Sequence, residues 1–146
     1  MIESYLLPML RTPSMNDAHF ESVLRINQLA TALQQADEAE IGEKLSALIE
    51  QTKSHYAHEE ALMLDKKFPP YPAHKEEHDE SLQAMQKAAT DFADTKDVEA
   101  LHYYVEHDLI PWFLRHTETM DAVTSIFLEN SEAHLPYWER LVPRKK

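Results

Sequence analysis

Seven residues of this sequence have the side-chain types and the spacing of a metal site. They are five histidines and two acids: His19, His55, Glu59, His74, His78, His116 and Asp121. The pairs His55/Glu59 and His74/His78 are each four residues apart, which on an α-helix places both side chains on one face, about 40° apart. Each pair could therefore offer two ligand atoms to one ion.

The composition limits the chemistry that this site can use. The chain has no cysteine, which excludes disulfides, thiolate zinc sites and cysteine nucleophiles, so any metal must be held by nitrogen and oxygen. A single glycine, Gly42, argues against the glycine-rich loops that bind nucleotide phosphates. The formal net charge of -12 would repel nucleic acid from most of the surface, so no nucleic-acid partner is expected.

The length of the chain indicates one domain. Its 146 residues are enough for one compact core, and we expect a single domain over 1–146, with a bundle at about 16–130 and a helical extension at about 131–146. Glu3 stands where a signal peptide would be basic, and no apolar run reaches the roughly 18 residues of a membrane span. We therefore expect a soluble, cytoplasmic protein without a membrane partner.

The apolar residues recur with a helical period along the chain. Four main helices are expected, at about 16–37, about 38–63, from about 72 to beyond 92, and about 97–129. Asn16 is a candidate cap for the first helix, and Pro111 should kink the fourth helix or mark a junction in it. The predicted fold class is all-α, an up-down-up-down four-helix bundle.

This topology explains why the seven residues could meet. The start of the first helix would lie beside the end of the second, the start of the third and the end of the fourth. His116 and Asp121 can meet only if the helix departs from regular geometry, because a spacing of five residues places side chains about 140° apart on a regular α-helix. We therefore predict a π-turn between them, which would bring the two side chains together.

The other four histidines are interpreted as surface residues. His102 and Glu106 are also four residues apart, but nothing at their level of the bundle completes a site. His58, His107 and His134 have no partner at a suitable level and face.

Several short motifs surround the candidate ligands. They are Asp17-Ala18-His19, His55-Tyr56-Ala57-His58-Glu59-Glu60 with Met63, Tyr71-Pro72 before His74-Lys75-Glu76-Glu77-His78, and Trp112-Phe113-Leu114-Arg115-His116 with Asp121. Through these motifs the chain resembles the hemerythrin-like, or bacteriohemerythrin, domain, the non-haem di-iron fold, over about residues 16–121.

The resemblance implies a cofactor of two iron ions, Fe(II) or Fe(III), with a bridging oxo or hydroxo group. It implies that His74, His78 and His116 bind one iron, that His19 and His55 bind the other, and that Glu59 and Asp121 bridge them. With these ligands and the bridging group, the first iron would have all six coordination positions filled, and the second would keep one position open. An open position suits a diatomic molecule. O2 would bind there end-on and be held as hydroperoxide.

Four further residues are expected at the O2 pocket: Ser22, Tyr56, Trp112 and Thr117. Ser22 and Thr117 stand where oxygen-binding members usually have bulky apolar residues, and Tyr56 stands where phenylalanine is common. Hydroxyl groups that face the open place would favour autoxidation or peroxide turnover over long-lived O2 binding.

Two function classes follow from this interpretation. The first is a non-enzymatic protein that stores, delivers or senses O2 and accepts other small ligands such as peroxide, azide or NO. The second is a di-iron enzyme of peroxidase or oxidase type. Other metal architectures fit less well. A ferritin-like site needs two Glu-x-x-His pairs, and only Glu99/His102 is present. A mononuclear zinc hydrolase usually has three protein ligands and a water on the metal, fewer than the seven candidates here, and the chain has no His-Glu-x-x-His run.

Overall fold

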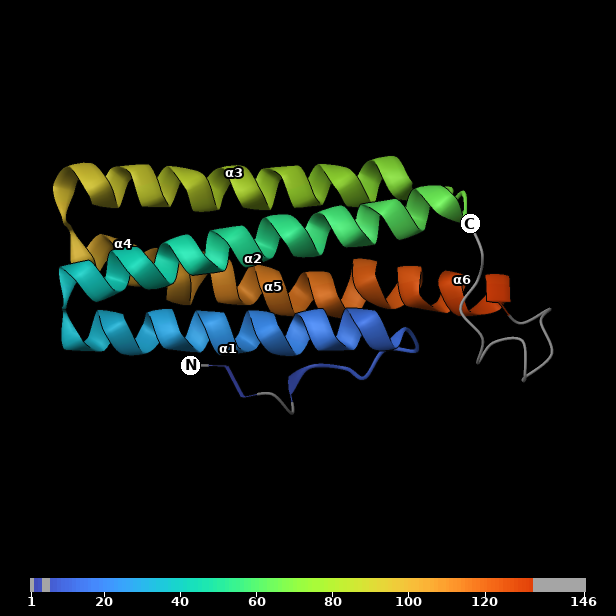
Figure 1. Cartoon of the computed structure of the whole chain (residues 1–146), viewed down its shortest axis with the longest axis horizontal. Helices are drawn as coiled ribbons and strands as arrows, with labels where there is room; N and C mark the ends of the chain where they lie inside the picture. Colours follow the sequence, from blue (N-terminus) through green and yellow to red (C-terminus); the bar gives the residue numbers. More distant parts are fainter. Residues whose placement is uncertain (1, 4–5, 133–146) are drawn as a thin grey trace.

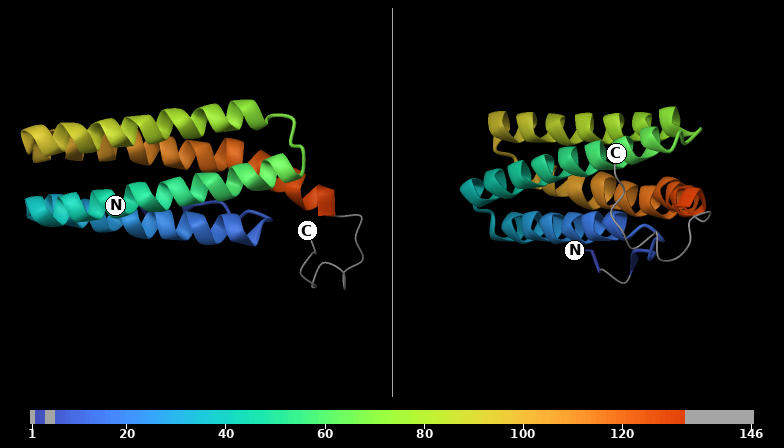
Figure 2. Two further views of the ribbon diagram at one scale, coloured as in Figure 1. Left: turned by 45° about the horizontal axis from the view of Figure 1, so that its top comes forward. Right: turned by 45° about the vertical axis from the view of Figure 1, so that its right-hand side comes forward.

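Four helical rods lie side by side and alternate in direction along the bundle (Figure 1). The structure, a computed structural model, describes residues 2–3 and 6–132. The first three rods are α1 (Pro13–Gln35), α2 (Glu38–Asp65) and α3 (Tyr71–Thr95). The fourth rod consists in order of α4 (Val98–Tyr104), η2 (Val105–Leu109), α5 (Ile110–His116), η3 (Thr117–Asp121) and α6 (Ala122–Glu132). The predicted up-down-up-down bundle is confirmed, and both views of Figure 2 show the four rods running roughly parallel.

Short connections between the rods keep neighbouring helices antiparallel. The Asp37 carboxylate accepts a hydrogen bond of 3.1 Å from the backbone N–H of Glu40 and so caps the start of α2. Ala36 and Lys96 end α1 and α3 in the left-handed conformation, with φ of 53° and 56°. Glycine is common at such positions, but here an alanine and a lysine adopt the left-handed conformation.

The start of α1 differs from the prediction that Asn16 caps it. The helix begins at Pro13, and Asn16 lies inside it. Proline at the first helical position has no N–H to satisfy and its φ already suits a helix, so the helix can begin there. The Asn16 amide instead accepts from the Leu10 N–H and donates to the Leu10 carbonyl, both at 2.8 Å, which holds the preceding segment against α1.

The fourth rod is interrupted where the sequence predicted a kink or junction at Pro111. The π-turn η2 ends just before it, and the Ile110 N–H donates to the carbonyl of Val105, five residues back. A wider turn at this point accommodates a residue that has no N–H of its own.

The bundle core consists of two apolar clusters. The larger cluster contains residues of all four rods, among them Val23, Ile26, Leu29, Ile41, Leu45, Leu48, Met85, Phe92, Leu101, Val105, Leu109 and Phe113. The smaller cluster contains Leu10, Met15 and Leu128. A further set of buried residues is polar, and His19, Glu59 and Asp121 are among them.

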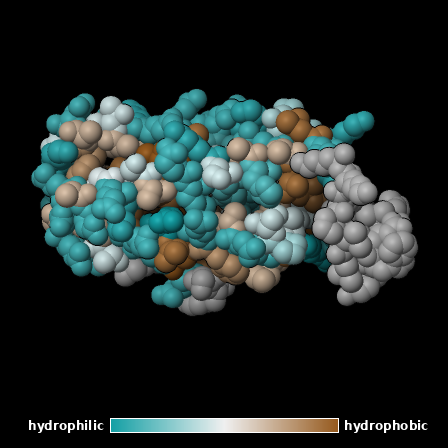
Figure 3. Space-filling model, in the orientation of Figure 1, coloured by the Kyte–Doolittle hydropathy of each residue, from teal (hydrophilic) through white to brown (hydrophobic). Residues whose placement is uncertain are grey.

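The outside of the bundle is mainly hydrophilic on the face that Figure 3 shows. None of the described helices combines the length with the apolar composition that crossing a membrane requires. Of the expected C-terminal extension, residues 131–132 belong to α6, and the rest lies outside the described residues.

Candidate metal centre

The rods bring all seven candidate ligands together at one end of the bundle. The start of α1, the end of α2, the start of α3 and the second half of the fourth rod lie together at the right of Figure 1. Each of the seven side chains is buried, with exposed fractions between 0% for His74 and 8% for His55. Such burial of imidazole and carboxylate groups is costly unless the groups are paired or bind a metal.

Glu59 lies between two groups of imidazoles. Its Oε1 atom is 2.9 Å from His74 Nε2 and 3.3 Å from His78 Nε2. Its Oε2 atom is 2.7 Å from His55 Nε2, on the other side of the carboxylate. Each oxygen of Glu59 therefore faces a different group of histidines.

Asp121 divides its oxygens in the same way. Its Oδ1 atom is 3.0 Å from His74 Nε2 and 3.1 Å from His116 Nε2. Its Oδ2 atom is 2.9 Å from His19 Nε2. Two carboxylates thus join a group of three imidazoles to a group of two, which is an arrangement for two metal ions with shared carboxylates.

The hydrogen-bond geometry supports metal ligation over ion pairing. Six ligand atoms of the site are buried and form no hydrogen bond within the part of the chain that the structure describes. They are the Nε2 atoms of His19, His74, His78 and His116, with Glu59 Oε1 and Asp121 Oδ1. Each such buried group would cost about 1–3 kcal/mol if it stayed unsatisfied. Metal bonds of about 2.1 Å place neighbouring ligand atoms about 3 Å apart, as these atoms are. The donor set therefore fits metal ions.

Three of the histidines are oriented by a hydrogen bond at the other ring nitrogen. The pairs are His78 Nδ1 with Glu60 Oε2 at 2.9 Å, His116 Nδ1 with Glu77 Oε1 at 2.9 Å, and His74 Nδ1 with Thr124 Oγ1 at 2.8 Å. These bonds fix the ring orientation and leave each Nε2 atom available to a metal ion. The sequence alone does not single out these three partners, because each lies on a different helix from the histidine that it contacts.

The charges of the site depend on one another. Burial raises the pKa of Glu59 and so does Asp121, but His55, His74 and His78 outweigh both and lower the pKa to about 2. Burial lowers the pKa of His74, but the two carboxylates raise it overall to about 9. Burial likewise raises the pKa of Asp121, while the imidazoles around it bring that pKa well below its ordinary value. The metal-free site therefore holds ionised carboxylates and attracts positive charge.

The predicted π-turn between His116 and Asp121 is confirmed. The element η3 covers Thr117–Asp121 and brings the Asp121 carboxylate to 3.1 Å from His116 Nε2. A π-turn is a common way to place ligands at a functional site.

A small cavity lies beside the ligands. It has about 20 Å³ of free space, enough for one molecule of the size of water or O2. Its walls are formed by Ser22, Ile26, Leu48, Thr52, His55, Tyr56, Met85, Leu109, Trp112, Phe113, His116 and Asp121. Ser22, Tyr56 and Trp112 of the expected pocket thus line it. Thr117 is not among its walls, and its hydroxyl donates to the Phe113 carbonyl at 2.8 Å.

Two aromatic rings stack on histidines of the candidate site. Tyr56 stacks on His78 with ring centroids 3.9 Å apart and an interplanar angle of 2°. Trp112 stacks on His116 with centroids 4.6 Å apart and an angle of 11°. Burial is the main cause that raises the pKa of Tyr56, so its hydroxyl stays protonated.

The histidines that were interpreted as surface residues lie outside this site. His102 and Glu106 form an exposed pair at 3.7 Å. His58 and His107 are exposed, and His134 lies outside the described residues.

Comparison with known proteins agrees with this geometry. The family profile described as "Hemerythrin HHE cation binding domain" matches residues 12–124. The chain belongs to the hemerythrin family. A bacteriohemerythrin of Aquifex aeolicus is 26% identical over 111 residues, 76% of this chain and 85% of that protein. A bacteriohemerythrin of Ralstonia nicotianae is 34% identical over 100 residues, 68% of this chain and 72% of that protein.

A solved structure shares the fold of this hemerythrin-like chain. It is described as a crystal structure of a leucine-to-phenylalanine mutant, with a TM-score of 0.75 and 21% identity, and the match covers 88% of this chain and 95% of that one. Family membership and the buried ligands together identify a hemerythrin-like iron protein.

Proposed function

We propose that this chain holds two iron ions and binds O2 reversibly at the cavity beside them. The observation that carries the proposal is the division of the Glu59 and Asp121 oxygens between two groups of imidazoles. One ion would be held by His74, His78 and His116, the other by His19 and His55, with one oxygen of each carboxylate on each ion. When bound, the pair of ions supplies two one-electron changes of oxidation state, the redox chemistry that reversible O2 binding needs.

The residues around the cavity would protect the bound ligand. All of its walls are buried except Trp112, which is partly exposed, so bulk water is kept away from the ligands. The apolar part of the walls includes Ile26, Leu48 and Met85, with exposed fractions of 1–2%. The small free space of about 20 Å³ would admit ligands of a few atoms, such as O2 or azide, and exclude larger oxidisable molecules.

An anaerobic titration of the Fe(II)-loaded protein with O2 tests this proposal. We expect two irons per chain by metal analysis, and a visible absorption band that forms with O2 and disappears when the gas is removed. A loaded protein that converts irreversibly to the ferric form on the first exposure to O2 would contradict reversible binding.

A second function, turnover of peroxide by the same site, is favoured by the hydroxyl-bearing residues in the cavity wall. Ser22, Thr52 and Tyr56 all line it, whereas a long-lived O2 complex would be better protected by apolar groups alone. Steady-state consumption of peroxide by the iron-loaded protein, compared with the same protein stripped by a chelator, distinguishes this function from O2 binding.

A further inference from the structure

The enclosed cavity creates a problem of proton transport. The ligand residues beside it are at most 8% exposed, so a proton released or consumed there has to cross protein before it reaches solvent. Both O2 binding and peroxide turnover involve protons, so the inference below rests on the proposed function.

Two of the hydroxyl groups at the cavity cannot pass a proton outward. Ser22 donates to the Ala18 carbonyl at 3.0 Å, and Thr52 donates to the Leu48 carbonyl at 2.8 Å. Ser22 also contacts the Gln51 side chain at 3.0 Å, but a neutral amide does not readily accept and release protons. Neither hydroxyl is therefore bonded to a group that can readily accept one proton and release another.

Tyr56 has a different partner. Its hydroxyl donates to Ser81 Oγ at 3.0 Å, so it is bonded to a second group that can both accept and donate a proton. Ser81 lines a separate cleft of about 150 Å³, whose walls also include the exposed acids Glu80 and Asp108. The bond between Tyr56 and Ser81 thus joins a wall of the cavity to a wall of the cleft.

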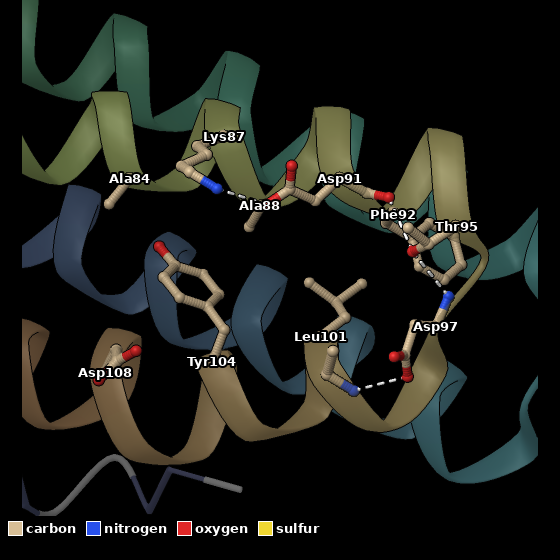
Figure 4. A pocket seen from close by; sticks show the side chains of 11 residues that line it. Ala84, Lys87, Ala88, Asp91, Phe92, Thr95, Asp97, Leu101, Tyr104 and Asp108 are labelled. Atoms are coloured by element: carbon tan, nitrogen blue, oxygen red, sulfur yellow. Dashed lines mark hydrogen bonds and ion pairs between the residues drawn. The ribbon is translucent and has the colours of Figure 1, made fainter.

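The cleft is next to the cavity on one side and to the surface on the other. Leu109 and Trp112 are walls of both the cavity and the cleft. On its outer side the cleft shares Ala84, Tyr104 and Asp108 with a larger groove of about 350 Å³ between α3 and α4. Figure 4 shows these three residues at one end of that groove, with Ala84 on the facing helix and Tyr104 between the two helices.

We propose that Tyr56 and Ser81 form a proton relay between the buried cavity and the cleft. A proton leaving the cavity bonds to Tyr56 Oη while the Tyr56 hydroxyl proton moves to Ser81 Oγ. The proton of Ser81 then moves to water or to the Glu80 carboxylate in the cleft. Each hydroxyl oxygen ends with one proton, so one proton is transferred and neither residue is left charged. The observed direction of the hydrogen bond, from Tyr56 to Ser81, suits outward transfer.

Azide binding to the diferric protein tests the relay without relying on turnover. Hydrazoic acid that enters the cavity and stays as the anion must release one proton. Stopped-flow mixing in H2O and D2O at several pH values would follow azide binding by visible absorption, because azide that is already an anion in solution gives no net proton signal. We expect Tyr56→Phe and Ser81→Ala to slow azide binding by about 10- to 100-fold, with the final absorbance and the azide affinity preserved.

Two further variants serve as controls. Ser81→Thr keeps a hydroxyl and should restore the wild-type rate, a rescue that a purely structural role of Ser81 would not predict. Tyr104→Phe removes a hydroxyl from the same cleft but not from the relay, and its rates should stay within about twofold of wild type. Iron content and the circular dichroism spectrum establish that each variant is folded and loaded with iron. If Tyr56→Phe loses iron, the comparison of Ser81→Ala with Ser81→Thr decides whether the relay stands.

The outcomes separate the relay from the proposed function. Wild-type rates in Tyr56→Phe and Ser81→Ala, or a Ser81→Thr variant as slow as Ser81→Ala, overturn the relay while the iron site stands. A wild-type protein that takes up no iron pair overturns the proposed function, and the relay with it.

Discussion

Raising the pH should destabilise the metal-free protein, because His74 holds a proton more strongly in the folded than in the unfolded chain. The two carboxylates at 2.9 Å and 3.0 Å from its Nε2 atom outweigh the effect of burial and raise its pKa from 6.5 to about 9. A group with a raised folded-state pKa contributes stability that is fully present below pH 6.5 and is lost as the pH rises through about 9.

The size of the effect follows from the shift. A pKa difference of one unit is worth about 1.4 kcal/mol, so the change at His74 corresponds to a loss of about 3 kcal/mol in the free energy of unfolding. The raised pKa of His116, for which Asp121 outweighs burial, acts in the same direction. With a urea dependence of about 1–3 kcal/mol per M, the unfolding midpoint should fall by on the order of 1–3 M.

Urea unfolding of chelator-treated protein between pH 6 and pH 9.5 measures this loss. The series ends below pH 10 because Tyr56, whose pKa is raised by burial, adds a loss of its own where the unfolded tyrosine ionises. His74→Gln should flatten the pH dependence, and the exposed His102→Gln should leave it unchanged. The urea midpoint of the iron-loaded protein should not fall over the same pH range, because a metal ion takes the place of the proton on His74. A midpoint for the metal-free protein that is constant or rises from pH 6.5 to 9.5 would refute the reasoning.

Three further predictions concern single side chains. Glu77→Gln removes the carboxylate that accepts a 2.9 Å bond from His116 and should weaken metal binding about 10- to 100-fold in a chelator competition, whereas the neighbouring exposed Glu76→Gln should not. Ser22→Leu replaces a hydroxyl in the cavity wall and should slow the loss of the O2 complex followed by absorption; an unchanged autoxidation rate would count against a role for that hydroxyl. Asp37→Ala removes the cap of α2 and should lower the free energy of unfolding by about 1 kcal/mol, with iron binding intact.

The sequence predicted most of what depends on local spacing. Four-residue intervals placed His55 with Glu59 on one helix face, and the structure has them 2.7 Å apart. The five-residue interval from His116 to Asp121 predicted a π-turn, because only a wider turn could bring both to one site.

The contacts between helices were harder to derive. Glu60 and Glu77 bind ring nitrogens of histidines on other helices, and no local spacing distinguishes them from the many exposed acids of this chain. The hydroxyl contact of Tyr56 with Ser81 joins α2 to α3 and depends on how the two helices are rotated about their axes. The prediction that Asn16 caps the first helix was wrong, because its amide forms hydrogen bonds with the preceding segment instead. That contact depends on how the segment folds back, which local sequence does not reveal.

The π-turn at Thr117–Asp121 has a consequence for how this sequence can change by insertion and deletion. A π-turn holds one residue more than an α-helical turn, so deleting a residue within it would leave a regular turn, and the helix beyond would keep nearly the same phase. Deleting a residue from the regular helix on either side would instead rotate everything beyond it by about 100° relative to the preceding helix. The bundle should therefore accept a one-residue deletion within Thr117–Asp121, but not one in the regular helix on either side, where the phase of α6 against the rest of the bundle would change. This π-turn is therefore a part of the fourth rod where a change of length disturbs the bundle least.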